Sequence, residues 1–289
     1  MGKIKKVILI NSKDTHYENV GGTMQFIQSR QNKVIKEVIS LKDKKNRRKS
    51  RKFLIEGYRF IYEAISSNAP IEKVIFSTDT DIKCQRRVIE KLGSKVNIYE
   101  VEPELFSQIA QTDTPQGVLC IVQVLEQALD TIYDNKFRGL VLDSIQDPGN
   151  AGTMIRTAHA LGFNAVLATE GTVDIYNGKV LRATMGSIFY IPVLENIGIE
   201  DFFRFCEINS IRVIASQIEN AKPCFNVDLT DSFCLVIGNE GNGISKCFQE
   251  RATEFINIPM PGGAESFNAA VAASIMMYES NRQIYCIKC

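Results

Sequence analysis

Three segments of the C-terminal half decide the fold: Asp147-Pro-Gly-Asn-Ala-Gly-Thr-Met-Ile-Arg156, Ile237-Gly-Asn-Glu-Gly-Asn-Gly-Ile-Ser245 and Ile256-Asn-Ile-Pro-Met-Pro-Gly-Gly-Ala-Glu-Ser-Phe-Asn268. Each places a loop rich in Gly, Asn or Pro between an apolar strand and a helix. In an open α/β sheet, ligands bind outside the carboxyl ends of the strands, against the N-termini of the helices. The three loops therefore predict one ligand site. Its distinctive polar side chains are Arg156, Glu240, Glu265, Ser266 and Asn268.

The apolar segments around these loops alternate between strand and helix patterns, as in a parallel α/β sheet. Strands are predicted at residues 139–143, 165–169, 189–193, 212–216, 233–237 and 255–258. Helices are predicted at residues 151–161, 178–185, 200–208 and about 267–284. The alanine-rich start of the last helix predicts close packing, either against another helix or against another subunit.

The first part of the chain alternates in the same way, which predicts a compact three-layer α/β sandwich. Strands are predicted at residues 53–57, 71–77, 96–101 and 118–124, and helices at 32–41, 58–66, 83–92 and 103–111. We expect two domains, residues 25–125 and 139–289, joined by a linker at 126–138. Residues 1–24 are expected to be an N-terminal extension, so that both Met1 and Met24 remain candidate native starts.

The composition is that of an ordinary soluble globular protein, with 45% apolar and 23% charged residues in 289. No apolar stretch is long enough for a membrane span, and the apolar run near the start is too short for a signal peptide. The eight cysteines are spread along apolar segments, which is typical of reduced cytosolic thiols. Cys286 and Cys289 lack two further ligands at zinc spacing, so no metal is expected.

Charge is distributed unevenly along the chain. Residues 1–130 hold 22 basic and 16 acidic residues, a net of +6, whereas residues 131–289 hold 12 and 17, a net of −5. Eight of the basic residues lie in one run from Lys42 to Lys52. A run of this kind is either a disordered tail or a phosphate-binding patch. Its place between two apolar-periodic segments favours contact with nucleic acid. The run consists of Lys42, Lys44, Lys45, Arg47, Arg48, Lys49, Arg51 and Lys52, with one acid among them.

The first loop combines a helix start with a cation. Asn150 is a good N-cap, and Gly152 would let a phosphate or carboxylate approach the backbone N–H groups. Arg156 lies one to two turns into the helix, from where its guanidinium could reach back over the loop. An arginine on a helix surface can equally be just solvated.

The other two loops also allow a structural and a functional interpretation. The glycines from Gly238 to Gly243 have the spacing G-x-x-G-x-G, which differs from the dinucleotide fingerprint and disfavours an NAD site. Glu240 could hold a cationic or hydroxyl-bearing group, or cap the next helix. Ser266 and Asn268 could contact a nucleotide or ribose, or cap the last helix.

With the three loops in order, the chain resembles SpoU-type (TrmH-like) RNA 2′-O-ribose methyltransferases of the SPOUT superfamily over about residues 27–289. The first family motif, N-x-G-x-x-x-R, matches Asn150, Gly152 and Arg156. The second and third motifs match residues 235–244 and 258–272. Residues 177–186 (NGKVLRATMG), 53–57 (FLIEG) and 114–118 (TPQGV) resemble further family segments.

The resemblance implies a ribosomal-protein-like α/β sandwich domain that binds the RNA substrate, followed by an α/β domain with a deep trefoil knot. It also implies a homodimer that binds S-adenosylmethionine in the knot loops, and the cysteine usage adds the expectation of a cytoplasmic location. The cofactor positions that the resemblance carries over are Gly238, Ile258, Phe267, Ala168, Gly243 and Met260. Family members usually have leucine where this chain has Phe267, so an apolar contact is kept with a different shape.

In the family, the arginine that matches Arg156 is thought to serve as the base or to hold the target phosphate. A guanidinium does not readily give up its proton, so stabilisation of the developing oxyanion and of the phosphate is favoured. Asn150, Glu240, Ser266 and Asn268 are expected to position the ribose and order the loops. The substrate implied is RNA, with large-subunit rRNA preferred over tRNA. A catalytically silent RNA-binding or ribosome-assembly factor is the remaining alternative.

Overall fold

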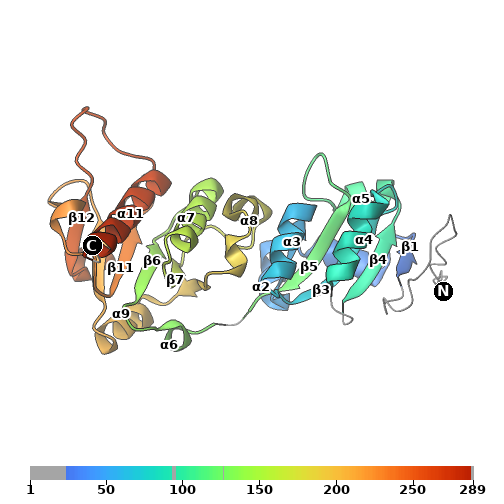
Figure 1. The fold of residues 1–289 in the computed structure, drawn as a ribbon, viewed down its shortest axis with the longest axis horizontal. Helices are drawn as coiled ribbons and strands as arrows, with labels where there is room; N and C mark the ends of the chain where they lie inside the picture. Colours follow the sequence, from blue (N-terminus) through green and yellow to red (C-terminus); the bar gives the residue numbers. More distant parts are fainter. Residues whose placement is uncertain (1–23, 93–95, 126, 288–289) are drawn as a thin grey trace. The chain divides into compact units, whose positions relative to one another are not determined.

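The computed structural model describes residues 24–92, 96–125 and 127–287. The predicted N-terminal extension, apart from Met24, and Cys289 of the C-terminal cysteine pair lie outside these residues. The chain divides into two compact units, residues 1–125 and 126–289 (Figure 1). Each unit is an α/β structure around its own sheet, so the predicted fold class is confirmed.

Unit 1 contains a five-stranded sheet in the order β1-β4-β3-β5-β2. Strands β1, β4 and β3 are parallel, and β5 runs antiparallel to both β3 and β2. The strands are β1 (Gln25–Ile27), β2 (Lys52–Glu56), β3 (Ile71–Ser77), β4 (Asn97–Val101) and β5 (Val118–Gln123). The helices are α1 (Lys33–Ser40), α2 (Lys44–Ser50), α3 (Tyr58–Ser66), α4 (Ile82–Lys91) and α5 (Pro103–Ile109).

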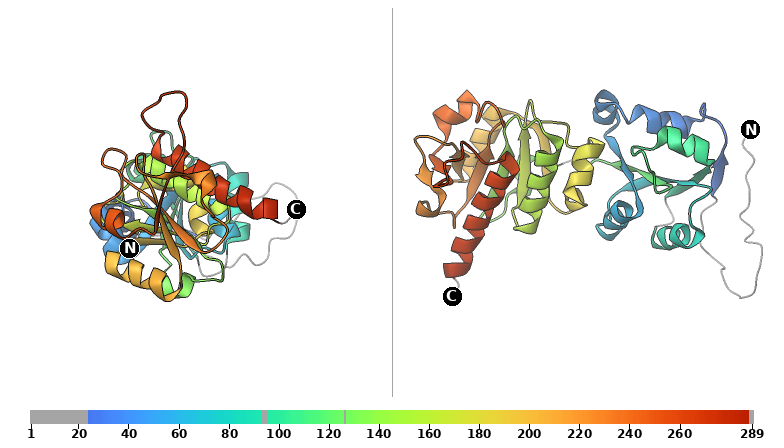
Figure 2. Two further views of the ribbon diagram at one scale, coloured as in Figure 1. Left: turned by 90° about the vertical axis from the view of Figure 1, so that its left-hand side faces the viewer. Right: turned by 90° about the horizontal axis from the view of Figure 1, so that it is seen from above.

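Helices cover both faces of this sheet (Figure 2, right). Successive strand residues point to opposite faces, and the consecutive residues Val74–Phe76 of β3 and Val118–Val122 of β5 are all apolar and buried. Leu54, Ile75 and Leu119 join one cluster with α1 and α5. Their strand neighbours point to the other side of the sheet, where α3 contacts β2 and β5 and packs against α4. Unit 1 is therefore a three-layer sandwich, as the strand and helix pattern predicted.

Unit 2 contains a seven-stranded sheet in which every described pairing is parallel, in the order β10-β12-β9-β11-β6-β7-β8. The strands are β6 (Arg138–Leu142), β7 (Ala165–Thr169), β8 (Val193–Ile197), β9 (Arg212–Ser216), β10 (Lys222–Pro223), β11 (Phe233–Ile237) and β12 (Glu254–Asn257). The helices are α6 (Leu129–Ile132), α7 (Pro148–Ala160), α8 (Gly178–Thr184), α9 (Ile199–Ile208), α10 (Lys246–Arg251) and α11 (Ala269–Ile287).

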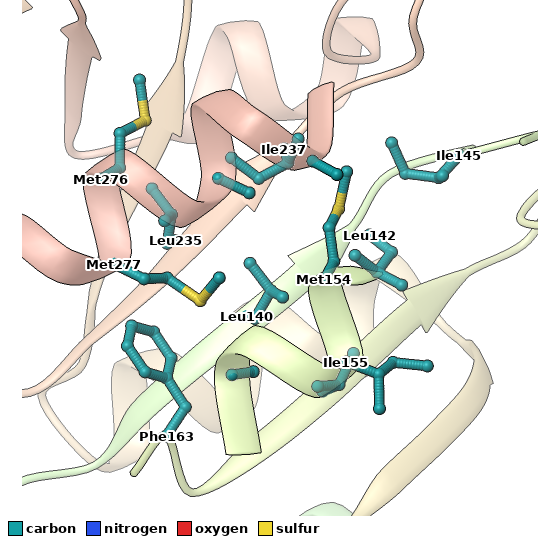
Figure 3. Close-up of a cluster of buried hydrophobic side chains, with 14 of the residues drawn as sticks. Leu140, Leu142, Ile145, Met154, Ile155, Phe163, Leu235, Ile237, Met276 and Met277 are labelled. Atoms are coloured by element: carbon teal, nitrogen blue, oxygen red, sulfur yellow. The ribbon is translucent and has the colours of Figure 1, made fainter. Parts of the chain in front are cut away.

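The two faces of this sheet carry separate apolar clusters. On one face, Leu140, Leu142, Leu235 and Ile237 pack against Met154 and Ile155 of α7 and Met276 and Met277 of α11 (Figure 3). On the other face, the alternate strand residues pack against the phenylalanines of α9 and Phe248 of α10. Burial on both faces explains why the strands are continuous apolar runs.

One predicted strand is wrong. Residues 189–193 were expected to be extended, but Ser187–Phe189 forms a 3₁₀ turn (η1) and β8 starts only at Val193. Pro192 has no N–H to donate to a strand ladder, so its carbonyl accepts from Val166 while regular pairing begins after it. The predicted linker also contains the short helix α6, and Ile132 and Phe137 of this segment are buried in unit 2.

Candidate active site

The three motif loops follow strands at the carboxyl edge of the unit 2 sheet. The chain runs from strand β6 outward to β7 and β8, and then continues on the other side of β6 with β9 to β12. The loops that follow β6 and β11 therefore meet at the point where the strand order reverses. In open parallel sheets, this switch point forms the ligand-binding crevice. The topology thus supplies a physical reason for a site here.

A chain of side-chain hydrogen bonds joins all three loops. Asn150 Nδ2 donates to Glu240 Oε1 at 2.9 Å, and Asn268 Nδ2 donates to Asn150 Oδ1 at 2.9 Å. Glu240 also accepts from the backbone N–H groups of Gln146 and Asp147, each at 3.4 Å. We call Asn268, Asn150 and Glu240 the amide–carboxylate chain. It brings together one residue from each predicted motif.

The ionised form of Glu240 suits its position as the hydrogen-bond acceptor of the amide–carboxylate chain. Partial burial opposes the charge, but the hydrogen bonds from Asn150 and from backbone N–H groups outweigh it and lower the pKa of Glu240. A lowered pKa means that folding favours the ionised carboxylate, and that the stabilisation is lost only as pH falls through the lowered value. The amide–carboxylate chain is therefore intact at neutral pH.

The N-caps of α7 and α11, the two helices at the site, agree with the sequence interpretation at Asn268 but not at Asn150. Asp147 is the N-cap of α7, since its carboxylate accepts from the backbone N–H of Asn150 at 2.7 Å and Pro148 occupies the first helical position. Asn150, predicted as the N-cap, lies inside the first turn, which leaves its amide available for Glu240. Asn268 accepts from the backbone N–H of Ala270 at 3.0 Å and so caps α11.

Two motif glycines serve packing inside the protein. A Cβ at Gly152 would lie 2.4 Å from Ala183 Cβ and 2.6 Å from the Val180 carbonyl oxygen, so this glycine allows α7 and α8 to touch. The expectation that Gly152 opens the loop to an anion is thus corrected. A Cβ at Gly238 would lie 2.2 Å from the backbone of Gly243 and Ile244. This contact forms because Asn239 and Gly243 pair as a tight antiparallel bridge.

Two further residues that order these loops were not singled out from the sequence. Asp143 is buried at the end of β6, and its carboxylate accepts from the Ser245 backbone N–H at 2.6 Å and from Thr169 Oγ1 at 3.2 Å. Asn239 donates to the Ser144 carbonyl at 2.9 Å. Their position in the sequence could have identified both residues, because each polar side chain comes directly or almost directly after an apolar strand.

Several predicted site residues lie outside these contacts. Arg156, Glu265 and Ser266 are exposed, and within the described part of the chain none of the three side chains makes a hydrogen bond or ion pair. Phe267 is 41% exposed, next to the capping residue Asn268. Of the other predicted cofactor residues, Ala168 is buried in β7 and Ile258 and Met260 are half-buried after β12. Gly243 has φ +69°, which favours glycine.

The basic run is an ordered part of unit 1, because residues 44–50 form α2. Three of its eight cations support the fold. Lys42 Nζ donates to the Gln108 and Ala110 carbonyls at 3.1 and 2.8 Å, and Arg47 Nη1 donates to the Leu41 and Lys42 carbonyls at 2.8 and 2.7 Å. Lys52 pairs with Glu37 and Glu72, and together with Lys73 it holds the pKa of Glu72 at about 2 against the effect of burial. Lys44, Lys45, Arg48, Lys49 and Arg51 have exposed side chains.

No cluster of three or more His, Cys, Asp or Glu side chains in the described segments could hold a metal ion. Among the same residues, none of the helices has both the length and the apolar character of a membrane span.

A sheet of parallel strands with linked loops at its switch point is typical of a ligand-binding domain, and in this chain it follows a separate α/β unit in the sequence. Residues 138–278 match the SpoU rRNA Methylase family, and residues 32–120 match the MRM3-like substrate binding domain. The chain is 34% identical to the 23S rRNA (guanosine(2553)-2′-O)-methyltransferase RlmP of Bacillus subtilis, over 88% of this chain and 98% of that protein. It is 27% identical to the 23S rRNA (uridine(2479)-2′-O)-methyltransferase of Streptomyces viridochromogenes, over 84% and 87%.

Solved structures agree with these matches. The AdoMet-bound rRNA methyltransferase from Sinorhizobium meliloti superposes with a TM-score of 0.82 at 29% identity, covering 91% of this chain and 99% of that one. The SpoU methyltransferase AviRb from Streptomyces viridochromogenes, in complex with AdoMet, gives 0.80 at 26% identity, covering 88% and 98%. The chain belongs to the SpoU rRNA methylase family. The predicted family, enzyme class and cofactor, S-adenosylmethionine, are thereby confirmed.

Proposed function

We propose that this protein transfers the methyl group of S-adenosylmethionine to a ribose 2′-hydroxyl in large-subunit rRNA. The amide–carboxylate chain carries this proposal, because it links the three family loops into one site at the switch point. The relatives that methylate 23S rRNA match nearly the whole chain, including the substrate-binding unit. This coverage favours rRNA over the tRNA alternative.

The residues at the sheet edge fit the cofactor. Ile258, Met260 and Phe267 offer apolar surface for an adenine ring, and the hairpin from Gly238 to Gly243 offers backbone polar groups. Within the described residues, Asn257 Oδ1 is buried without a hydrogen-bond partner, directly before Ile258, and could accept a bond from a ligand. Ala168 would close the site from β7. The cofactor, when bound, supplies an electrophilic methyl group on a sulfonium.

The protein's own residues then position and stabilise the RNA. A ribose hydroxyl is a poor nucleophile and has to be held in line at short range. Arg156, exposed on α7, would stabilise the developing oxyanion and hold the neighbouring phosphate through its fork of N–H donors. Asn150, Glu240 and Asn268 would keep the loops in register, with Ser266 available to the ribose.

Three finer properties belong to the same proposal: a trefoil knot in unit 2 and a homodimer, which the resemblance implies, and a cytoplasmic location, which the cysteine usage indicates. Support for the homodimer comes from α11, where Val271, Tyr278 and Tyr285 are exposed at seven-residue spacing and so share one side of the helix. Sedimentation of the purified protein measures this: Tyr278→Glu should shift the dimer toward monomer.

The amide–carboxylate chain is expected to act as a unit. Asn150→Ala and Glu240→Gln should each lower kcat by about 10- to 100-fold, because loops that shift by about 1 Å misalign the reactants. The double variant should lose little more than either single variant, since both break the same chain. Steady-state methylation assays measure this. Additive losses would show that the two residues act separately.

The exposed lysines of α2 are expected to contact RNA phosphates. Replacing Lys44, Lys45 and Lys49 together by glutamine should reduce the slope of log Kobs against log salt by about 2–3, at roughly 0.7–0.9 per lost contact. Filter binding of rRNA between low and high salt measures the slope. Lys246→Gln, which removes an exposed charge from α10 in unit 2, is the control. An unchanged slope in the triple variant would remove α2 from the RNA interface.

The function itself is tested by incubating the protein with tritiated S-adenosylmethionine and total RNA from cells that lack its gene. Label in 23S rRNA, mapped as a 2′-O-methyl group, is the expected result. Label in tRNA alone would show that the substrate is tRNA. Absence of methyl transfer with intact RNA binding would favour the catalytically silent factor.

A further inference from the structure

A buried carboxylate lies at the end of β6, between two strands that lead to expected cofactor positions. Asp143 is 2% exposed and comes directly after β6. Its backbone N–H donates to the Ile237 carbonyl of β11 at 2.9 Å, and β6 pairs on its other side with β7. Gly238 follows β11 directly, and Ala168 belongs to β7. Asp143 thus lies between two of the positions at which we expect S-adenosylmethionine.

Donors from two different segments share this carboxylate. The Ser245 backbone N–H donates to one oxygen at 2.6 Å, and the Thr169 hydroxyl donates to the other at 3.2 Å. Ser245 ends the second motif loop (residues 237–245), and Thr169 is the last residue of β7. A buried carboxylate is tolerated only where hydrogen bonds replace its lost hydration. Asp143 therefore ties the end of the second motif loop to β7.

The next residue holds the start of the same loop. Ser144 has φ +57°, a left-handed conformation that is uncommon for residues other than glycine and is unfavourable by itself. Its backbone N–H donates to Thr169 Oγ1 at 3.1 Å, and its carbonyl accepts from Asn239 Nδ2 at 2.9 Å. The second motif loop is thus fixed near both of its ends, by Asn239 and by Ser245, to one short segment after β6.

These contacts are separate from those of the amide–carboxylate chain. Glu240, in the middle of the loop, is held by Asn150 and by two backbone N–H groups of the first motif loop. Asp143 holds the end of the loop instead. Removal of the Asp143 carboxylate should therefore move the backbone that follows Gly238 while Glu240 keeps its own hydrogen bonds.

We propose that Asp143 is a positioning residue for the cofactor: its carboxylate keeps the second motif loop at the distance from β7 that S-adenosylmethionine requires. This inference rests on the proposed function, since it needs the cofactor to lie between Gly238 and Ala168. Both carboxylate oxygens accept hydrogen bonds from the protein, so the effect of Asp143 on the cofactor passes through the loop.

The test compares Asp143→Ala with Asp143→Asn by calorimetry with S-adenosylmethionine. Alanine leaves the Ser245 N–H without this acceptor, so Kd should rise by about 10- to 100-fold, as for groups misplaced by about 1 Å. Asparagine keeps an oxygen for Ser245 and can donate its amide to Thr169 Oγ1, whose hydroxyl can turn to the Leu142 carbonyl. Asp143→Asn should therefore bind the cofactor with nearly the wild-type affinity.

Two further measurements distinguish positioning from a merely structural role. In methylation assays of Asp143→Ala, KM for the cofactor should rise with Kd, while kcat at saturating cofactor stays near the wild-type value. Without cofactor, backbone hydrogen exchange of residues 238–245 should be faster in Asp143→Ala and unchanged in Asp143→Asn. The control is Ser280→Ala, which removes a buried hydrogen bond to the Leu229 carbonyl near Arg138, the first residue of β6. It should lower the melting temperature without changing Kd.

The outcomes separate this inference from the proposed function. If the wild type binds S-adenosylmethionine but methylates no RNA, the proposed function fails, whereas the Kd comparison still decides the role of Asp143. Wild-type Kd and KM in Asp143→Ala would overturn the inference even if its melting temperature falls. An equal loss of affinity in Asp143→Asn and Asp143→Ala would also overturn it, because the charge and not the tether would then be required.

Discussion

Replacement of Arg156 by lysine is expected to lower kcat for RNA methylation by ~10²–10³-fold, the cost of removing one aimed donor from a developing oxyanion. Lysine keeps the positive charge but loses the planar fork that binds a phosphate and an oxygen together. Arg156 is exposed and makes no hydrogen bond or ion pair within the described chain, so the substitution should not disturb the fold.

The affinity for S-adenosylmethionine should remain near that of the wild type, because the expected cofactor contacts come from other loops. Single-turnover assays measure the chemical step, and calorimetry measures cofactor binding. Arg204→Lys is the control, since Arg204 is an exposed arginine of α9, on the opposite face of the sheet. Normal turnover in Arg156→Lys would refute the assigned role. A parallel loss of cofactor affinity would instead place the guanidinium in the cofactor site.

Replacement of Gly238 by alanine is expected to weaken cofactor binding by about 100-fold, because a Cβ here cannot fit without moving the loop by an ångström or more. The Cβ would lie 2.2 Å from Gly243 C and Ile244 N, which are backbone atoms and cannot rotate away. The bridge between Asn239 and Gly243 would open, and with it the hairpin that carries Glu240. Overpacking of this kind typically costs about 1–3 kcal/mol of stability.

The same loop supplies a matched control. A Cβ at Gly241 would have its nearest contact at 3.6 Å, from Asn239 Oδ1, and its backbone N–H could still donate to that oxygen. Gly241→Ala should therefore bind S-adenosylmethionine like the wild type. Calorimetry and thermal unfolding of both variants measure the difference. Equal affinities in the two variants would show that the close approach at Gly238 does not shape the cofactor site.

Local patterns in the sequence were sufficient for most of the elements. Buried parallel strands are continuous apolar runs, which is why 212–216 and 233–237 were predicted with the bounds of β9 and β11. Loops of Gly, Asn and Pro after these strands marked the site. The family followed from three motifs in order. The missed start of β8 shows the limit, since a short apolar run around Pro192 fits a strand or a turn equally well.

Only the tertiary structure decided what each site residue contacts. The sequence places Asn150, Glu240 and Asn268 up to 118 positions apart, and the parallel sheet with its reversed strand order brings their amides and carboxylate within hydrogen-bond distance. The tertiary structure also shows that Gly152 allows two helices to pack closely. It shows that Lys42, Arg47 and Lys52 stabilise the fold of unit 1. The physical reason is that secondary structure depends on neighbours along the chain, whereas hydrogen bonds and packing depend on neighbours in space.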